Sequence, residues 1–393
     1  ILLADDRSYA FLFRDRRLTG FAVSLSSQKA AVMVSELRKA FEESSAGSYP
    51  PFDVLMSHEL YKRMFAPIAD QLVGVTHLVT APSGALLSLP FGLLVTDPPP
   101  RIRDQDYTRV QWLAKQTAIS LVPSVRSFVD LRAIAQPSSA PKSFIGFGDF
   151  VPYSSETIAR AMSALPEECR SDEKLVDKYL KLVQSLGALP YTQIEVKAIA
   201  RTFPENSAQI YLKQDFNQET LLTTPLDQYR IVYFATHALL PYEIQCQPEP
   251  SLIASVPPVE SDDADGFIAL GEVLRFRLDA DLVVLSACST GGPGLESGGE
   301  SLSGLARAFF FAGARSLLVS HWAVQDQPTA IIMISMFERL RDDQRSGIAD
   351  ALRDAQMGIL RESRKPGREY LSHPLYWAAF TLVGDGARNV AKI

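Results

Sequence analysis

Cysteine is scarce in this sequence, and its scarcity argues against one class of protein. Three of the 393 residues are cysteine, namely Cys169, Cys246 and Cys288. A number this small and odd does not provide the disulfide framework of a small secreted domain. We therefore expect a reducing compartment and a cytoplasmic location. Cys169 and Cys246 lie near no histidine or glycine in the sequence, so we expect both to be incidental.

Long apolar runs and an excess of basic residues are also missing. No run reaches the ~18 apolar residues that a membrane-spanning helix needs. The chain has 39 Lys and Arg against 45 Asp and Glu, a net charge of −6, so no direct nucleic-acid binding is expected. It begins with Ile1 and has no basic-then-apolar secretory signal. We therefore expect a trimmed piece that lacks an upstream region.

The common motifs for metals and phosphates are absent as well. Neither His-Glu-x-x-His nor a pair of Cys-x-x-Cys motifs occurs, so no zinc site is expected. Gly292 and Gly294 do not begin a dinucleotide-binding fingerprint, because Ser297 occupies the position of its third glycine. The serine-hydrolase motif Gly-x-Ser-x-Gly is missing around Ser301. We expect neither a metal nor an organic cofactor.

Short apolar segments alternate with helical patterns, which predicts an α/β fold. The Pro- and Ser-rich segment 136–141 is typical of a linker, and we place the domain boundary there. Residues 1–140 would form an N-terminal α/β supporting region that begins with a hairpin, and residues 141–393 the main domain. Continuous apolar runs predict mostly parallel strands that are buried on both faces. These expected strands are 144–148, 209–212, 231–235, 282–286, 316–320 and 377–383. Residues 247–265, rich in proline, serine and acidic side chains, would form a mobile surface insertion.

Two of the expected strands run into reactive side chains. Segment 231–235 leads to Thr236-His237, and segment 282–286 leads to Ala287-Cys288. If the two strands are parallel neighbours, His237 and Cys288 emerge at the same sheet edge. A thiol nucleophile needs a nearby base, because the thiolate is its reactive form. Taken singly, Cys288 also fits a small buried side chain and His237 a core histidine; the pair favours catalysis.

At these residues the sequence resembles a known family. Ala235-Thr236-His237 and the segment 285–291, Leu-Ser-Ala-Cys-Ser-Thr-Gly, are similar to the CHAT domain family of caspase-like domains. His237 precedes Cys288 by 51 residues, which fits the ~50 residues that separate His and Cys in caspases. Supporting segments are 80–84, 89–91, 189–191, 299–302 and 312–314.

The resemblance implies a fold and a dyad. The fold would be a caspase-like α/β/α sandwich with a mostly parallel central sheet, shared with separases and gingipains. His237 would be the general acid/base and Cys288 the nucleophile of a peptidase. The backbone N–H groups of Ala238 and Cys288 would form the oxyanion site. Related peptidases commonly have glycine after the histidine, but the Ala238 amide can still donate.

The resemblance also implies a substrate pocket and a partner. Segment 320–326 looks like the Trp-containing loop that lines the first substrate pocket of separases. Trp322 would then line this pocket, and Asp326 would bind an Arg or Lys before the cut. Asp326 is equally suited to be a helix N-cap, and His321 to be a second base or a pocket wall. Relatives are often joined to tetratricopeptide repeats in bacteria, which implies a regulatory protein or an upstream repeat domain.

The sequence therefore predicts a cysteine endopeptidase that acts on proteins or peptides and prefers Arg or Lys before the cut. A partner or a missing N-terminal region would regulate it. The alternative is a catalytically silent caspase-like interaction or scaffold module in a bacterial signalling or defence system, because a fold does not guarantee its chemistry.

Overall fold

The computed structural model describes residues 1–42, 49–133, 136–163, 165, 167–239, 249–257, 265–287 and 304–390. Their contacts divide the chain into two compact units. The first takes its residues mainly from 1–135 and 321–389, and the second from 136–290 and 303–320. This grouping brings 321–389 together with the N-terminal residues. The two domains expected at 1–140 and 141–393 stay a prediction.

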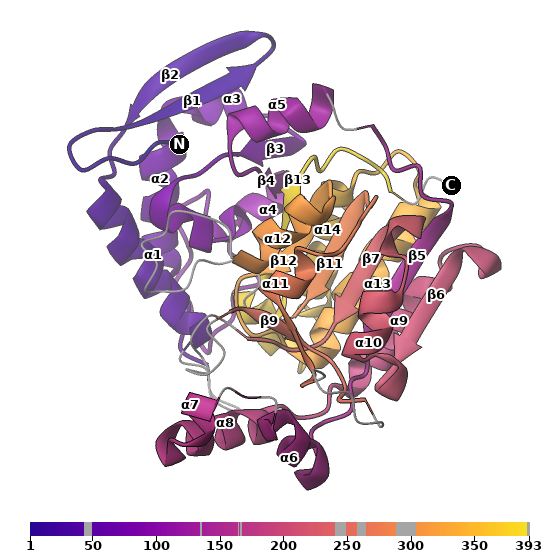
Figure 1. Ribbon diagram of the computed structural model, residues 1–393. Coiled ribbons are helices and arrows are strands. Elements are labelled where there is room, and N and C mark those ends of the chain that lie inside the picture. Colours follow the sequence, from indigo (N-terminus) through magenta and orange to yellow (C-terminus); the bar gives the residue numbers. More distant parts are fainter. Residues whose placement is uncertain are drawn as a thin grey trace. The chain divides into compact units, whose positions relative to one another are not determined.

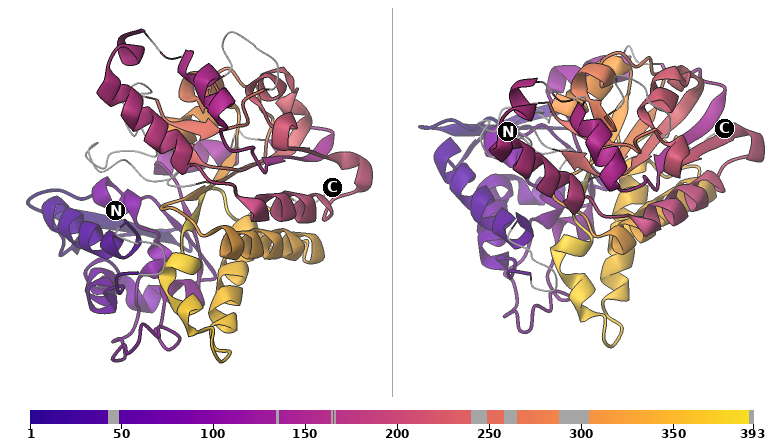
Figure 2. Two further views of the ribbon diagram at one scale, coloured as in Figure 1. Left: turned by 90° about the horizontal axis from the view of Figure 1, so that it is seen from below. Right: turned by 60° about the horizontal axis from the view of Figure 1, so that its bottom comes forward.

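The first unit combines a hairpin, a parallel sheet and helices (Figure 1). Its strands are β1 (Ser8–Arg14), β2 (Arg17–Val23), β3 (His77–Thr80), β4 (Ala118–Leu121) and β13 (Phe380–Gly384). Strands β3, β4 and β13 are parallel neighbours in that order. Its helices are α1 (Ser27–Glu42), α2 (Val54–Phe65), α3 (Ala69–Leu72), α4 (Leu113–Gln116), α5 (Val125–Ala133), α13 (Asp326–Asp342) and α14 (Ile348–Glu362). Helices α13 and α14, orange to yellow in Figure 2, pack side by side.

Aromatic side chains form much of the core of this unit. All three tryptophans of the sequence, Trp112, Trp322 and Trp377, lie here, and none is more than 2% exposed. The rings of Trp112 and Trp377 are 5.4 Å apart, and that of Trp322 stacks on Phe41 at 3.8 Å. Burial of such large rings is a principal source of stability.

The second unit contains five parallel strands in the order β12, β11, β7, β5 and β6. Their bounds are β5 (Lys142–Gly148), β6 (Ala208–Leu212), β7 (Tyr229–Ala235), β11 (Leu282–Ser286) and β12 (Ser316–Ser320). A small antiparallel sheet consists of β8 (Ala238–Leu239), β9 (Ser251–Ile253) and β10 (Phe267–Ala269). The helices are α6 (Ser155–Ser163), α7 (Glu167–Arg170), α8 (Glu173–Ser185), α9 (Pro190–Ala200), α10 (Gln218–Thr223), α11 (Leu270–Val273) and α12 (Gly304–Ala312).

Helices cover both faces of this five-stranded sheet. Successive residues of β7 point to opposite faces. Tyr233 reaches Glu195 on α9, whereas the ring of Phe234 lies 5.6 Å from that of Phe309 on α12. The predicted α/β class with a mostly parallel sheet is therefore confirmed. All six expected strands are present, but the last begins at Phe380 instead of Trp377.

The expected mobile surface insertion at residues 247–265 is wrong for those of its residues that the structure describes. Composition suggested that residues 247–265 form a mobile insertion, yet Ser251–Ile253 is the central strand of the small sheet. All three residues of this strand are fully buried. No helix in the ranges given above is long and apolar enough to cross a membrane.

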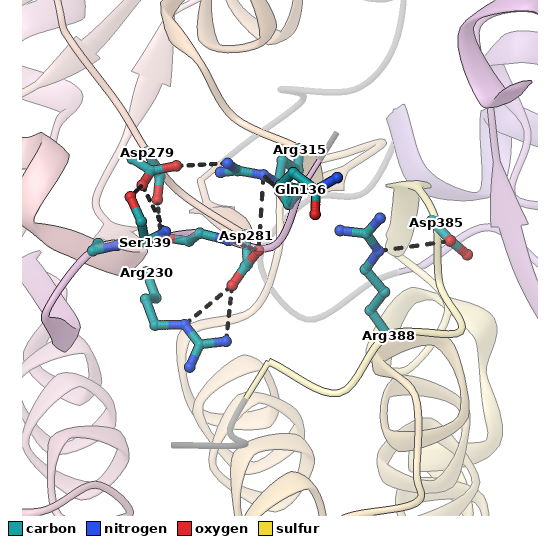
Figure 3. Close-up of polar contacts among 10 residues, drawn as sticks. Gln136, Ser139, Arg230, Asp279, Asp281, Arg315, Asp385 and Arg388 are labelled. Atoms are coloured by element: carbon teal, nitrogen blue, oxygen red, sulfur yellow. Dashed lines mark hydrogen bonds and ion pairs between the residues drawn. The ribbon is translucent and has the colours of Figure 1, made fainter. Parts of the chain in front are cut away.

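A cluster of charges ties the linker before β5 to the amino ends of the neighbouring strands (Figure 3). Arg315, just before β12, binds Asp279 with an N–O distance of 2.6 Å. Both the N–H and the hydroxyl of Ser139 lie 2.8 Å from Asp279 Oδ2. Arg230 binds Asp281 at 3.0 Å, and this carboxylate is 4% exposed. In the first unit, Figure 3 also shows Arg388 with Asp385, 3.8 Å apart.

The Asp279 contacts predict an acid-sensitive contribution to stability. Burial opposes ionisation of this carboxyl, but hydrogen bonds from Ser139 and Arg315 outweigh it and hold the pKa below its usual value. A lowered pKa stabilises the fold above the unfolded-state pKa of about 4, and this is lost as the pH falls through the folded-state pKa. In the Asp279→Asn variant, the free energy of unfolding is therefore expected to fall less steeply as the pH drops below ~4. The midpoint of urea unfolding, followed by circular dichroism at a series of pH values, measures this dependence.

An exposed aspartate provides the control for this prediction. Asp177 pairs with Lys181, and their side chains are 60% and 73% exposed. Such pairs contribute about 0–1 kcal/mol, so Asp177→Asn is expected to leave the acid profile unchanged. Equal profiles for Asp279→Asn and the unmodified chain would contradict the assigned contribution.

The outer face of the N-terminal hairpin is apolar. Tyr9, Phe11 and Phe13 alternate along β1 and are 42%, 57% and 71% exposed. Leu18, opposite Phe13 on β2, is 68% exposed. Phe13→Ser is therefore expected to change the free energy of unfolding by less than about 0.5 kcal/mol and to reduce self-association in light scattering. Destabilisation by several kcal/mol would show that this face is covered in solution.

Candidate active site

Strands β7 and β11 bring the two candidate segments to one edge of the second unit. They are parallel neighbours over five register pairs, from Leu282 opposite Ile231 to Ser286 opposite Ala235. Each strand is completely buried at its carboxyl end, which explains the apolar runs in the sequence. His237 stands two residues beyond Ala235, so the strand pairing assumed from the sequence is confirmed for the described residues.

His237 is held by a backbone carbonyl and an aromatic ring. Its Nε2 atom lies 2.9 Å from the carbonyl oxygen of Gly187, in the loop between α8 and α9. A carbonyl oxygen only accepts hydrogen bonds, so Nε2 carries the proton and Nδ1 is the basic nitrogen of the neutral ring. The ring also meets Phe150 edge-on, with centroids 5.3 Å apart. The two contacts fix both the plane and the tautomer of the imidazole.

The residue before the histidine anchors this strand end. Thr236 is 2% exposed, and its hydroxyl donates to the carbonyl of Ile253 at 2.5 Å. The N–H of Thr236 donates to the carbonyl of Ser286 at 3.3 Å, which extends the ladder between β7 and β11 by one bond. The backbone at His237 therefore continues from a rigid, paired strand.

Cys288, the predicted nucleophile, lies outside the described residues, as does the glycine-rich segment after it. The described segment that contains β11 ends at Ala287, which is 1% exposed. The hydroxyl of Ser320, the last residue of β12, donates to the carbonyl of Ala287. The residue that directly precedes the predicted nucleophile is thus fixed by the next strand of the sheet.

Ala238, predicted to donate to an oxyanion, lies at the start of β8. Its partner on the antiparallel strand β9 is Leu252. In the neighbouring pair, the N–H of Ile253 donates a hydrogen bond of 2.9 Å to the carbonyl of His237. Hydrogen-bonded and non-bonded pairs alternate in such a ladder. The Ala238 N–H is therefore directed away from β9, and β8 is the outermost of the three strands described in its sheet.

The residues predicted to bind substrate lie in the first unit. Trp322 is 2% exposed and stacks on Phe41 with an interplanar angle of 7°. A substrate would reach this ring only after the stack opens. Asp326 is the first residue of α13, and Gln325 is its N-cap, so the alternative of Asp326 as the N-cap is wrong. A carboxylate in the first turn still stabilises a helix through the macrodipole.

His321, weighed as a second base, is a core residue of the same unit. It is 2% exposed, and its Nε2 lies 3.1 Å from the hydroxyl of Thr381. Burial, reinforced by the charge of Arg38, lowers the pKa of His321 to about 3. The ring is therefore neutral at physiological pH.

Cys169, in α7, is disulfide-bonded. Its sulfur is therefore not a thiol nucleophile in this state, and the expectation that this cysteine has no part in the site stays a prediction. Cys246 lies outside the described residues. Within the described ranges no three His, Cys, Asp or Glu side chains come together as a group able to hold a metal ion.

No motif in the sequence indicates the Gly187 and Ser320 contacts. Every residue has a backbone carbonyl, so the carbonyl that orients His237 leaves no trace in residue identity. Ser320 was expected only as the end of a strand. A hydroxyl at a strand end beside a reactive segment is a weak sequence signal for such a contact.

Comparison with known proteins adds a family and some relatives. The CHAT domain family matches residues 55–385. Tetratricopeptide repeat protein 28 of Mus musculus is 27% identical over 152 residues. That match covers 38% of this chain and 6% of the mouse protein, so the chain spans a small part of the relative's length.

Two solved structures are similar at low identity. The Arg-specific cysteine proteinase gingipain R of Porphyromonas gingivalis is 9% identical, with a TM-score of 0.42, over 92% of this chain and 74% of that one. The separase–securin complex of Saccharomyces cerevisiae is 14% identical, with a TM-score of 0.41, over 87% of this chain and 18% of that one. No residue's role follows from these two similarities.

Proposed function

The chain belongs to the CHAT domain family, and from this premise we propose that it is a cysteine endopeptidase with His237 as base and Cys288 as nucleophile. The observation that carries the proposal is the in-register parallel pairing of β7 and β11 directly before these two residues. In a parallel pair, side chains in register point to the same face. If the alternation of each strand continues, both side chains project on the face that α9 covers.

The proposed reaction begins with proton transfer. Nδ1 of His237 accepts the thiol proton of Cys288, and the thiolate attacks the carbonyl carbon of a peptide bond. The N–H groups of Ala238 and Cys288 donate to the oxygen as negative charge develops there. The imidazolium then protonates the leaving amine, and a thioester forms. Water attacks this thioester, with His237 as base, and releases the acid and the free thiol.

Regulation and location belong to the same proposal. A partner protein or a repeat region controls access to the dyad, and the enzyme acts in the cytoplasm of a bacterium as part of a signalling or defence system. The tetratricopeptide repeat protein among the relatives is consistent with a repeat-domain context. The competing function is a silent scaffold of the same fold.

Covalent labelling tests the dyad without knowledge of the natural substrate. A peptidyl acyloxymethyl ketone is expected to alkylate Cys288 in the reduced full-length chain, as mapped by mass spectrometry. His237→Ala is expected to slow labelling at pH 7 by tenfold or more, because the thiolate loses its base. Cys246→Ala serves as the control and is expected to label like the unmodified chain.

Protein cleavage provides the second readout of the same proposal. Cys288→Ala is expected to abolish cleavage of any substrate found, with a loss of roughly 10⁴-fold or more. Cleavage that survives Cys288→Ala, or a complete lack of labelling with and without candidate partners, would favour the scaffold.

The preference for Arg or Lys before the cut is proposed on the negative charge of Asp326. A charge-assisted hydrogen bond contributes about 1.5–3 kcal/mol, so Asp326→Asn is expected to lower the ratio of cleavage after Arg to cleavage after Leu by about tenfold. A panel of fluorogenic peptides measures this ratio. Glu338→Gln is the control, because it removes the same charge from an exposed position of α13. Equal Arg-to-Leu cleavage ratios in Asp326→Asn and Glu338→Gln would contradict the role of Asp326 in substrate preference.

A further inference from the structure

The N-terminal hairpin of the first unit (Figure 1) has a free backbone edge along β2. On β1, Tyr9 exchanges both of its backbone hydrogen bonds with Leu2, at 2.8 and 3.0 Å. Its N–H and C=O therefore point away from β2, and the pair that Tyr9 forms with Ala22 is a non-bonded pair. Because bonded and non-bonded pairs alternate, the backbone groups of Ala22, Gly20 and Leu18 all point away from β1. Within the described ranges nothing outside the hairpin bonds to them, so β2 can accept another strand.

The same edge borders the apolar outer face of the hairpin. The residues opposite Phe11 and Phe13 are Gly20 and Leu18. Together with Tyr9, these side chains expose roughly 400–500 Å² of apolar surface, taking ~200 Å² for a whole side chain. A patch of this size on one chain often marks a binding surface. A Cβ atom at Gly20 would lie 3.3 Å from Cε1 of Phe11, so the Phe11 ring lies over the glycine. A strand added beside β2 would therefore meet a backbone edge and an aromatic ring.

The two ends of the hairpin differ in charge. The tip, residues 14–17, contains three arginines and one aspartate, whereas the base, residues 5–7, contains two aspartates and one arginine. Asp15 and Arg16 both have a positive φ, which makes the tip a tight two-residue turn. Arg16, Arg17 and Asp6 are exposed, and none of them forms an ion pair within the described ranges. At the base, residues 6–9 and 22–26 line a hollow of about 570 Å³.

We propose that two copies of this chain associate through their β2 strands, antiparallel and related by a two-fold axis at Gly20. In this register Gly20 faces its counterpart, and Leu18 of each copy faces Ala22 of the other. These are hydrogen-bonded pairs, because their backbone groups point outward. The two hairpins then form one four-stranded sheet, which is more stable than a lone two-stranded hairpin. The association is independent of the proposed peptidase activity.

Charge favours a second copy as the occupant of this edge. The antiparallel pairing sets the positive tip of each hairpin beside the negative base of the other. Arg17 then faces Val23 of the other copy, one of the residues that line the hollow at the base. A parallel pairing would bring two positive tips together, and like charges side by side are destabilising. Two-fold symmetry uses the same surface twice, so the opposite ends of one hairpin are sufficient for both contacts.

Glycine at the axis favours this particular register. Neighbouring strands lie ~4.8 Å apart. Because neither facing Gly20 has a side chain, the two Phe11 rings that lie over them can contact each other across the axis. A register shifted by two residues would place Leu18 or Ala22 of the other copy against Gly20 instead. The side chain of that residue would separate the two rings.

Sedimentation velocity on the full-length chain tests the association. The unmodified chain is expected to change from monomer to dimer as its concentration rises. Ala22→Pro removes an outward N–H and keeps the ladder to β1, because this N–H does not bond to β1. Each dimer then lacks two hydrogen bonds, so the dissociation constant is expected to rise by about tenfold or more. Ala22→Ser keeps the N–H and is the control, expected to stay within about threefold of the unmodified chain.

A cysteine at the axis tests the register. In a hydrogen-bonded pair the facing Cα atoms are ~5.5 Å apart, which a disulfide can span. Gly20→Cys is therefore expected to form a disulfide between two copies when oxidised glutathione is added and is itself reduced to two thiols. Mass spectrometry of the linked peptides identifies it. Thr19→Cys is the control, because position 19 faces Phe21 of the other copy, and about tenfold less of its disulfide is expected.

Each outcome supports the association or overturns it. A chain that stays monomeric at every concentration overturns the proposal and leaves the edge of β2 to a strand of another protein. A dimer that Ala22→Pro does not weaken, or in which Gly20→Cys forms no disulfide, uses another surface and overturns it too. Urea unfolding checks that each variant is folded; if Ala22→Pro is not, the disulfide decides. Cys288→Ala is expected to dimerise like the unmodified chain, so association and peptidase activity are tested separately.

Discussion

The arrangement of the candidate site depends on the register between β7 and β11. Five paired residues set Ser286 beside Ala235, and the ladder adds a bond from the Thr236 N–H. A shift by one residue would turn every side chain of one strand to the opposite face. The base and the segment before the thiol would then diverge.

The ion pairs and the candidate site lie at opposite edges of the five-stranded sheet. The ion pairs of Arg230 and Arg315 lie at the amino ends of the strands, and His237 lies beyond the carboxyl end of β7. A parallel sheet separates the two edges by the length of its strands.

Much of this fold could be predicted from the sequence because its strands are buried on both faces. Runs such as 231–235 and 282–286 contain no polar residue before their ends, so composition alone identifies them. Ser251–Ile253 was missed because its neighbours are rich in proline, serine and acid, and the average over the segment hid a three-residue strand. The His237 position followed from its place after a strand, but its orientation depends on a carbonyl that sequence does not specify.

The predictions for Trp322 and Asp326 rested on a resemblance of segment 320–326 to a substrate-binding loop. Such a resemblance shows which residues are present but not how they pack. A tryptophan in a short loop after a strand suits an open pocket and a closed stack equally well. Burial on Phe41 depends on α1, some 280 residues away in sequence, and no local pattern carries that information.

The confinement of all three tryptophans to the first unit gives the molecule an optical asymmetry. Indole emission depends on the polarity around the ring, so it follows the packing around Trp112, Trp322 and Trp377. Strand β7, which leads to His237, carries tyrosine and phenylalanine instead. Tryptophan fluorescence, excited at the red edge of absorption, would therefore report the unfolding of the first unit and not that of the second. Its unfolding midpoint would coincide with the midpoint from far-ultraviolet circular dichroism only if both units unfold together.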